Sequence, residues 1–349
     1  MSSFPSIVVV AGPTAAGKSA IGLRLAEELG GEIVSIDSVQ VYQGADIGSA
    51  KPSPEERQRV PHHGLDLWEP SHAGDMAQFL SAAREVILGI AARKKTVVCI
   101  GGTGLYLTGL LHGLAELPPA DDKLRAELES LSNEELVARL SSSDSAAAKR
   151  LHPNDRVRLI RAIEGSELTG EPMSVRHARH NYRETLYRAI VVVPLWPRVE
   201  LYRRIDERTA AMVEGGLLRE TRGIIERYGE AAAVLDALGY AEARKVMRGE
   251  LMESALVPAI AQATRRFAKR QMTYWRNEPL KRGWSVRPRG DECAVELSQG
   301  AGGAAGAPFR VTSTDFRTLV SEVRGWFAGG AADPGVTVQF VSARELLAP

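Results

Sequence analysis

Near the start of the chain, glycine, lysine and serine residues have the spacing of a phosphate-binding loop. Gly12 is followed by Gly17, Lys18 and Ser19 in the pattern G-x-x-x-x-G-K-S. The amides of such a loop and of the helix after it converge on an anion, which predicts a di- or triphosphate site. Lys18 would reach the terminal phosphates and the Ser19 hydroxyl would bind Mg²⁺; the alternative is a glycine-rich turn without a ligand. The predicted phosphate-binding residues are Gly12, Pro13, Thr14, Ala15, Ala16, Gly17, Lys18 and Ser19.

One carboxylate stands where it could act on what the loop binds. An apolar run at 32–36 ends at Asp37, whereas the run at 96–100 ends in the glycines of 101–104. A standard P-loop NTPase has a metal-binding aspartate at the end of such a strand. Asp37 would hold a metal or accept a proton, unless it only caps the turn after its strand. Arg208 is predicted either to point a cation at the phosphates or to form a salt bridge.

A helical segment at 254–276 has a one-sided charge pattern. The apolar face predicted to pack on the core contains Ile260, Ala263, Phe267 and Tyr274. The opposite, basic face contains Arg265, Arg266, Lys269 and Arg276. A basic stripe suits a phosphate backbone, whereas a merely solvated face usually carries mixed charges. For a second basic set, surface charge and nucleic-acid contact are equal alternatives; it comprises Lys149, Arg150, Arg156, Arg158 and Arg161.

The elements that position these residues alternate between strands and helices. Buried strands are predicted at 7–11, 32–36, 96–100 and 189–193, and the first helices at 18–29 and 76–93. This order predicts an α/β fold of the P-loop NTPase type, a parallel sheet with helices on both faces and ligands at the carboxyl ends of its strands. Residues 1–117 and 188–290 would form this core and its C-terminal helices. Residues 118–187 would be an all-helical insertion, and 291–349 a linker and tail without an assigned role, containing a Gly- and Ala-rich linker at 299–308.

Composition excludes several classes of protein. The 349 residues carry a net charge of +1 and are 44 % hydrophobic, as in an ordinary globular protein. No run is long and apolar enough to span a membrane, and the first residues lack the charged start of a signal peptide. Cys99 and Cys293 are the only cysteines. Disulfide scaffolds and cysteine-rich zinc sites are therefore excluded, and we expect a cytoplasmic protein.

The combined motifs resemble those of the tRNA dimethylallyltransferases, or tRNA isopentenyltransferases, of the bacterial type. The resemblance covers about residues 5 to 285 and is most specific where 37–52 and 264–276 occur together. The matching segments are 12–19, 37–52, 62–70, 101–107, 152–164, 238–242 and 264–276. Residues after about 285 match no pattern, and no zinc finger of the eukaryotic relatives follows them.

This resemblance implies transfer of a prenyl group to tRNA. The loop would hold the diphosphate of dimethylallyl diphosphate with Mg²⁺ on Ser19, helped by Arg208. Asp37 would accept the proton of the exocyclic amine of the adenine just 3′ of the anticodon, a base that must be flipped out of its stack. We expect a monomer that binds the anticodon stem-loop. The tRNA-binding residues implied are Asp37, Ser38, Val39, Gln40, Thr103, Arg125, Val157, Arg158, Leu159, Ile160, Arg161, Arg265, Arg266 and Lys269.

Other functions share the phosphate-binding loop. A small-molecule P-loop kinase would also place an aspartate after the second strand, but it needs neither the basic helix nor the helical insertion. An RNA-binding NTPase switch would need the metal-binding aspartate that is missing after 96–100. A prenyltransferase acting on free adenine nucleotides would share the core and differ in preferring AMP to tRNA.

Overall fold

The chain forms two compact units, and each is described by itself. The computed structural model describes residues 5–114, 121–180, 185–277, 284–288, 295–299, 309–312, 315–328 and 336–347. The sheet unit comprises Met1–Leu111 and Thr185–Pro349, and the helical unit comprises His112–Glu184. The boundary predicted at Pro118 lies outside the described residues, as does most of the linker predicted at 299–308. At the other boundary, Leu186 already belongs to the sheet unit, where its amide donates to Leu111 O at 2.8 Å.

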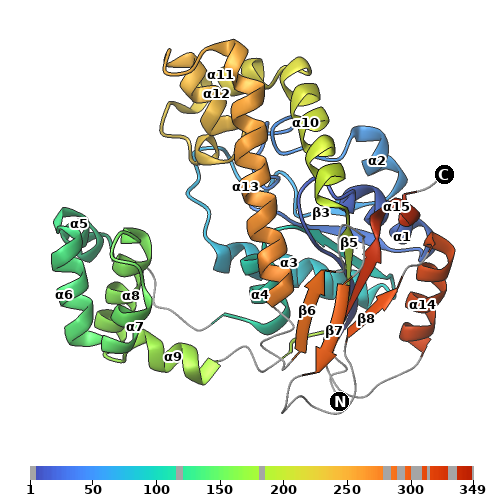
Figure 1. Ribbon diagram of the computed structural model, residues 1–349, viewed down its shortest axis with the longest axis horizontal. Helices are drawn as coiled ribbons and strands as arrows, with labels where there is room; N and C mark the ends of the chain where they lie inside the picture. Colours follow the sequence, from blue (N-terminus) through green and yellow to red (C-terminus); the bar gives the residue numbers. More distant parts are fainter. Residues whose placement is uncertain are drawn as a thin grey trace. The chain divides into compact units, whose positions relative to one another are not determined.

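A parallel sheet forms the centre of the sheet unit (Figure 1). The strand order is β3-β2-β4-β1-β5-β9-β8, and every neighbouring pair in it is parallel. The predicted α/β fold and its four strands are confirmed. A separate antiparallel pair joins β6 (Trp284–Pro288) to β7 (Val295–Gln299). The strands of the main sheet are β1 (Ser6–Val10), β2 (Glu32–Ile36), β3 (His62–His63), β4 (Val97–Gly101), β5 (Arg188–Leu195), β8 (Phe309–Thr312) and β9 (Val336–Ser342).

Helices cover both faces of the sheet because its central strands are apolar on both sides. Val8, Val10 and Val192 share one buried cluster with side chains of α1 (Lys18–Glu28) and α14 (Phe316–Ala328). Residues that alternate with these in the strands, such as Val9 and Cys99, are equally buried and face the opposite side. The helices α3 (Met76–Ala92) and α4 (Gly104–His112) cover that side (Figure 1). The predicted two-sided layering is therefore confirmed.

The C-terminal segment corrects one prediction. Residues 291–349 were expected to be a linker and tail, yet β9 pairs with β5 along its whole length, from Ala189–Val336 to Leu195–Ser342. The helix α14 buries Phe316, Leu319, Val320 and Val323 in the core cluster. A seven-residue strand flanked by residues without a clear pattern gives a weak local signal, and its partner strand lies far away in the sequence.

The helix predicted at 254–276 is α13 (Leu256–Asn277), and its buried face differs in part from the prediction. Ile260 of the predicted apolar face is buried, whereas Ala263, Phe267 and Tyr274 are only partly buried. Besides Ile260, the helix buries Thr264, Ala268, Gln271 and Trp275. Two polar side chains in this stripe concealed it from a hydrophobic pattern. The remaining helices of the sheet unit are α2 (Pro54–Arg59), α10 (Arg198–Glu214), α11 (Leu217–Tyr228), α12 (Tyr240–Met247) and α15 (Ala343–Leu346).

The helical unit has its own apolar core. Leu128, Leu136, Leu140, Leu159 and Ile163 are fully buried in it. Its longest helix begins at an aspartate cap, where Arg158 N donates to Asp155 Oδ1 at 3.3 Å, and ends at Gly170 in the left-handed conformation. The unit contains α5 (Asp122–Ser130), α6 (Asn133–Ser143), α7 (Ser145–Arg150), α8 (Arg156–Thr169) and α9 (Met173–His180). In the described part of the whole chain, no helix is both long and apolar enough to cross a membrane.

Candidate active site

The phosphate-binding loop connects β1 to α1 as predicted. Gly17 caps the helix with a φ of +85°, a left-handed conformation that favours glycine. A side chain there would also collide with Leu347, which would lie 2.5 Å from its Cβ. The segment therefore places the first amides of α1 and the side chains of Lys18 and Ser19 at the carboxyl end of the central strand.

Residues from α10, α13 and the segment after β5 hold this loop from outside. Arg204 Nε donates to Ala15 O at 2.9 Å, and Trp196 Nε1 donates to Ala16 O at 3.2 Å. Thr14 N donates to Gln271 Oε1 at 2.8 Å. These bonds fix the loop before any ligand binds, which is the preorganisation expected of a site that binds developing charge.

Two cations point into the same pocket. Lys18 Nζ donates to Pro13 O at 2.8 Å, and Arg208 Nη1 donates to Thr14 Oγ1 at 3.2 Å. Burial, and next the positive charge of Arg208, lowers the pKa of Lys18 to about 8, while Asp37 opposes this shift. Burial also lowers the pKa of Arg208. Two cations whose charges are both disfavoured by burial make a strong site for an anion such as a diphosphate.

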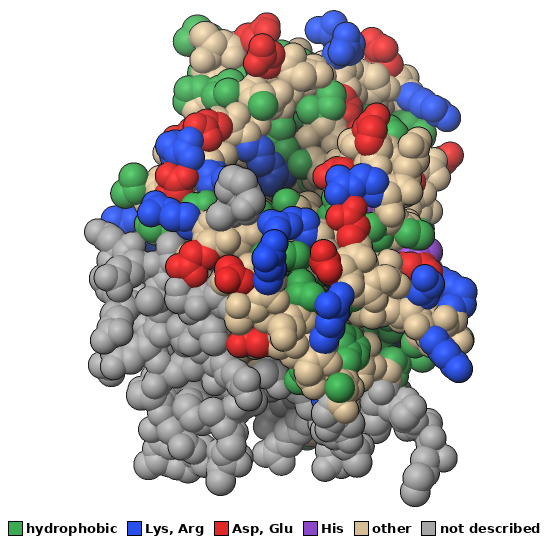
Figure 2. All heavy atoms as spheres, turned by 90° about the vertical axis from the view of Figure 1, so that its right-hand side faces the viewer, with side chains coloured by type: hydrophobic (Ala, Val, Ile, Leu, Met, Phe, Trp, Pro, Cys, Tyr) green, Lys and Arg blue, Asp and Glu red, His purple; other side chains and the backbone are tan. Residues whose placement is uncertain are grey.

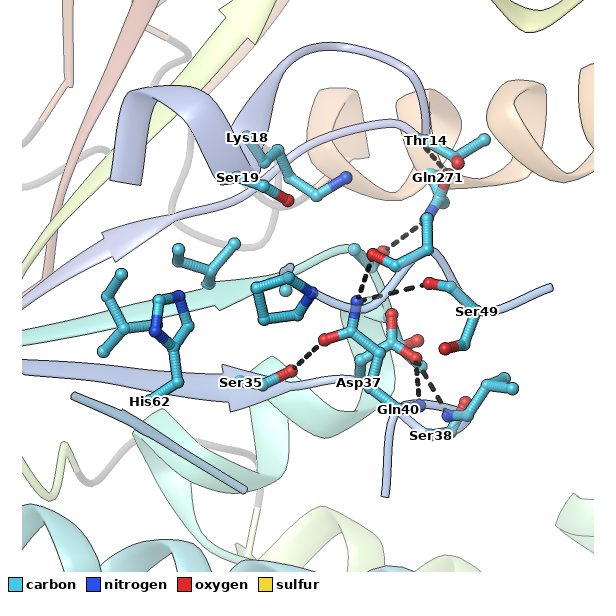
Figure 3. A pocket seen from close by; sticks show the side chains of 18 of the residues that line it. Thr14, Lys18, Ser19, Ser35, Asp37, Ser38, Gln40, Ser49, His62 and Gln271 are labelled. Atoms are coloured by element: carbon cyan, nitrogen blue, oxygen red, sulfur yellow. Dashed lines mark hydrogen bonds between the residues drawn. The ribbon is translucent and has the colours of Figure 1, made fainter. Parts of the chain in front are cut away.

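Asp37 lies at the end of β2 and lines this pocket (Figure 3). Its Oδ1 accepts the backbone amides of Val39 at 2.8 Å and Gln40 at 3.3 Å. The turn-capping alternative is thus part of its role. Among the described residues, Oδ2 has no hydrogen-bond partner, and this oxygen can accept a proton from a substrate. One carboxylate can therefore both cap the turn and accept a proton, because capping uses only Oδ1.

Gln40 organises the segment that follows. Its Nε2 donates to Ser49 O at 3.2 Å and Ala50 O at 3.1 Å, and its Oε1 accepts from Ser35 Oγ at 2.7 Å (Figure 3). The side chain is therefore occupied by the protein itself. It shapes the pocket wall and is not free to bind a substrate through these atoms.

Gln271 was missed in the sequence, although it connects two parts of the site. It is 5 % exposed, and its Nε2 donates to Gly102 O at 2.9 Å while its Oε1 holds the Thr14 amide. A Cβ on Gly102 would lie 2.5 Å from Gln271 Nε2, which explains the glycine. A glutamine next to a basic stripe gives no local signal of such a bridge.

One pocket brings together all three predicted catalytic residues and several of the predicted tRNA-binding residues. His62 also lies in the wall of this pocket, with Nδ1 2.7 Å from Val60 O. Burial lowers the pKa of His62, which favours the neutral ring. The predicted residues that line the pocket are Thr14, Lys18, Ser19, Asp37, Ser38, Val39, Gln40, Thr103 and Arg208.

The predicted basic residues are not equivalent. Arg265 forms an ion pair with Asp206 of α10, whereas Arg266 and Lys269 are exposed. The side chain of Arg276 lies outside the described residues. The stripe on α13 is therefore partly neutralised. The molecular face in Figure 2 likewise shows acidic and basic side chains interspersed.

In the helical unit, two predicted tRNA-binding arginines share one acid. Arg125 Nη2 lies 3.1 Å and Arg161 Nη1 2.7 Å from Oε2 of Glu164, whose side chain is fully buried. This pairing lowers the pKa of Glu164, although burial acts in the opposite direction. The side chains of the two arginines are 40 % and 39 % exposed. Val157 and Arg158 are exposed too, while Leu159 and Ile160 are buried in the unit's core. Leu159 and Ile160 therefore cannot bind tRNA through their side chains, because these side chains are buried against other apolar residues of the unit.

The sheet unit is therefore a P-loop α/β protein in which Lys18, Arg208 and Asp37 line one pocket, while β4 ends in glycine. A carboxylate can take a proton from an acceptor while two cations stabilise an anionic leaving group, so the pocket suits a transferase. The family model described as IPP transferase matches residues 40–278, and the one described as isopentenyl transferase matches residues 5–66. The chain belongs to this family, the tRNA dimethylallyltransferases.

Individual relatives agree with the family models. The tRNA dimethylallyltransferase of Anaeromyxobacter dehalogenans (strain 2CP-C) is 46 % identical over 276 residues, covering 78 % of this chain and 92 % of the relative. Among solved structures, the full-length tRNA isopentenylpyrophosphate transferase from Bacillus halodurans is similar to this chain. The two are 32 % identical with a TM-score of 0.59, and the match covers 93 % of this chain and 96 % of that one. A eukaryotic dimethylallyltransferase described as acting on tRNA has a TM-score of 0.68 at 27 % identity, covering 77 % and 69 %.

Proposed function

We propose that this enzyme transfers the dimethylallyl group of dimethylallyl diphosphate to the exocyclic amine of the adenine 3′-adjacent to the anticodon in tRNA, releasing diphosphate. The observation that carries the proposal is the pocket in which Lys18 and Arg208 face Asp37. A kinase would share the phosphate loop, yet membership of the dimethylallyltransferase family favours prenyl transfer.

In the reaction, the bond between the prenyl carbon and the diphosphate oxygen breaks while a bond from the adenine nitrogen to that carbon forms. Lys18, Arg208 and the amides at the start of α1 stabilise the charge that develops on the leaving diphosphate. The amine loses a proton as it bonds to carbon, and Asp37 Oδ2 accepts it. The capping of Oδ1 by Val39 and Gln40 orients that oxygen.

The pocket fits Mg²⁺, which we propose as the cofactor. The described residues contain no cluster of three or more His, Cys, Asp or Glu side chains that could hold a metal. Mg²⁺ commonly needs only one or two protein oxygens together with substrate phosphates and water, and the Ser19 hydroxyl offers such an oxygen in this pocket. When bound, the ion would neutralise charge on the diphosphate.

For the tRNA, we propose that Ser38, Val39, Gln40 and Thr103 surround the flipped adenine. The exposed basic residues Arg266 and Lys269 of α13 would hold the phosphates of the anticodon stem-loop, together with Arg125, Arg158 and Arg161 of the helical unit. Arg265 would contribute less, because Asp206 already neutralises it. We also propose that the enzyme acts in the cytoplasm and as a monomer. One unit of one chain lines the pocket, which supports the monomer.

The decisive experiment incubates the protein with labelled dimethylallyl diphosphate, Mg²⁺ and unmodified tRNA. Prenylated adenine in the tRNA is expected, and its absence would refute the proposal, especially if ATP is consumed with a small acceptor instead. Replacing the tRNA with AMP tests the acceptor.

The Asp37→Asn variant tests the base. Asparagine keeps an oxygen that can cap the turn but does not accept the proton, so turnover should fall by about 10² to 10⁴-fold. Binding of tRNA, measured by filter retention, should change little. A variant with wild-type turnover would contradict the role of Asp37.

A further inference from the structure

We infer that Glu220, which lies on α11 outside the pocket, is a positioning residue that holds the pocket wall at 45–50 and, through it, the Asp37 turn. The inference rests on the proposed function for its catalytic consequence. Its structural basis is a set of hydrogen bonds between one carboxylate and a distant backbone segment.

Three successive backbone amides converge on this carboxylate. Glu220 Oε2 accepts from Asp46 N at 3.0 Å and from Ile47 N at 2.8 Å, and Oε1 accepts from Gly48 N at 3.0 Å. Consecutive amides arranged in this way form an anion-binding concavity. Here the anion belongs to the protein itself, and α11 supplies it.

A buried tyrosine completes the arrangement. Tyr240 is fully buried, and its hydroxyl donates to Glu220 Oε1 at 2.6 Å. Burial, followed by the neighbouring Glu220 charge, raises the pKa of Tyr240, so the hydroxyl keeps its proton and remains a donor. A Cβ on Gly48 would lie 2.4 Å from the Tyr240 ring, so the segment packs directly on that ring. The backbone at 46–48 is thus fixed by charge on one side and by an aromatic surface on another.

The segment held in this way continues into the pocket. Ser49 and Ala50 come next in the chain, line the pocket, and accept hydrogen bonds from Gln40 Nε2 at 3.2 and 3.1 Å. Gln40 N in turn donates to Asp37 Oδ1 at 3.3 Å. Glu220 is therefore connected to the proposed base through three successive sets of hydrogen bonds, without touching a substrate.

The phosphate-binding residues do not share these contacts. Lys18 and Arg208 bond to Pro13 and Thr14 of the loop at 12–19. Loss of the hydrogen bonds between Glu220 and the backbone at 46–48 should therefore slow the prenyl-transfer step, because a misplaced reacting group reacts more slowly. The binding of dimethylallyl diphosphate should remain almost unchanged. A residue that only stabilised the fold would not separate these two quantities.

The test compares Glu220→Gln with Glu226→Gln, an exposed glutamate on the same helix. Glutamine retains the size of Glu220 but only one acceptor oxygen. Amide hydrogen exchange at 46–48 should become at least about ten-fold faster in Glu220→Gln, since those amides lose protection. The single-turnover rate on tRNA should fall at least about ten-fold, with the KM for dimethylallyl diphosphate within about two-fold of wild type. The Glu226→Gln variant should match wild type in all three.

Tyr240→Phe keeps the inference testable if Glu220→Gln unfolds, because phenylalanine retains the ring under Gly48 and removes one hydrogen bond. It should also slow the transfer step, by a smaller factor. Unchanged exchange and an unchanged single-turnover rate in a folded Glu220→Gln or Tyr240→Phe would overturn the inference. Wild-type protein that exchanges slowly at 46–48 but prenylates no tRNA would instead refute the proposed function and the catalytic consequence drawn from it.

Discussion

Raising the pH should weaken the binding of dimethylallyl diphosphate through a single group, Lys18. Its pKa of about 8 lies well below the ordinary value of 10.5, mainly because of burial and secondly because of Arg208. The diphosphate is already fully ionised at neutral pH, since a phosphate's last pKa is about 6. The diphosphate binds the ammonium form of Lys18, which predominates below pH 8 and is lost above it. At pH 9 only about a tenth of the free enzyme carries that charge, so KM should be about ten-fold above its low-pH plateau.

Replacing Arg208 with methionine tests whether its charge contributes to the lowered pKa of Lys18. The variant removes the second positive charge, so the pKa of Lys18 should rise and the pH at which KM increases should move upward. At every pH, KM should be higher than in wild type, because one diphosphate-binding cation is missing.

The assay is the KM for dimethylallyl diphosphate at saturating tRNA between about pH 7 and pH 10, checked by proton uptake on binding in buffers of different ionisation enthalpy. A KM that stays flat to the highest pH would refute the assignment of a lowered pKa to Lys18. A rise at the same pH in wild type and Arg208→Met would refute the coupling between the two cations.

Two further predictions concern α13. Gln271→Met removes the bonds to Thr14 N and Gly102 O and should reduce the free energy of unfolding by about 1–3 kcal/mol, measured by urea denaturation, with a raised KM for dimethylallyl diphosphate; unchanged values would show that the bridge is dispensable. Joint replacement of Arg266 and Lys269 by glutamine should weaken tRNA binding. The slope of the logarithm of the binding constant against the logarithm of the salt concentration should become shallower by about two units, with diphosphate binding unaffected. An unchanged slope in filter-binding titrations would exclude phosphate contacts by these residues.

Local patterns were sufficient to predict the centre of the sheet and the phosphate loop. The runs at 7–11, 32–36 and 96–100 are rich in apolar, mostly β-branched residues and are followed directly by glycine or aspartate, so strand identity and the position of Asp37 follow from the sequence alone. The loop pattern adds the phosphate site because its chemistry is contained in eight consecutive residues.

Contacts between distant segments could not be predicted in this way. Gln271 acts on Thr14 and Gly102 only once α13 lies against the loop, and no spacing in the sequence encodes that approach. The buried stripe of α13 was partly misplaced for the same reason, since Gln271 is polar yet interior. Arg125 and Arg161 were assigned to tRNA from charge and resemblance, while their common partner Glu164 becomes evident only in the folded helical unit.

The position of β9 has a consequence for folding during synthesis. Residues 336–342 emerge from the ribosome long after β5, yet they lie between β5 and β8. Until then, β5 is the edge of a parallel sheet and presents unpaired amides and carbonyls along an apolar strand. Such edges are templates for aggregation, and domains generally fold from the N-terminus as they are made. The nascent chain therefore carries this exposed edge next to β1, the strand before the phosphate loop, until β9 pairs with β5.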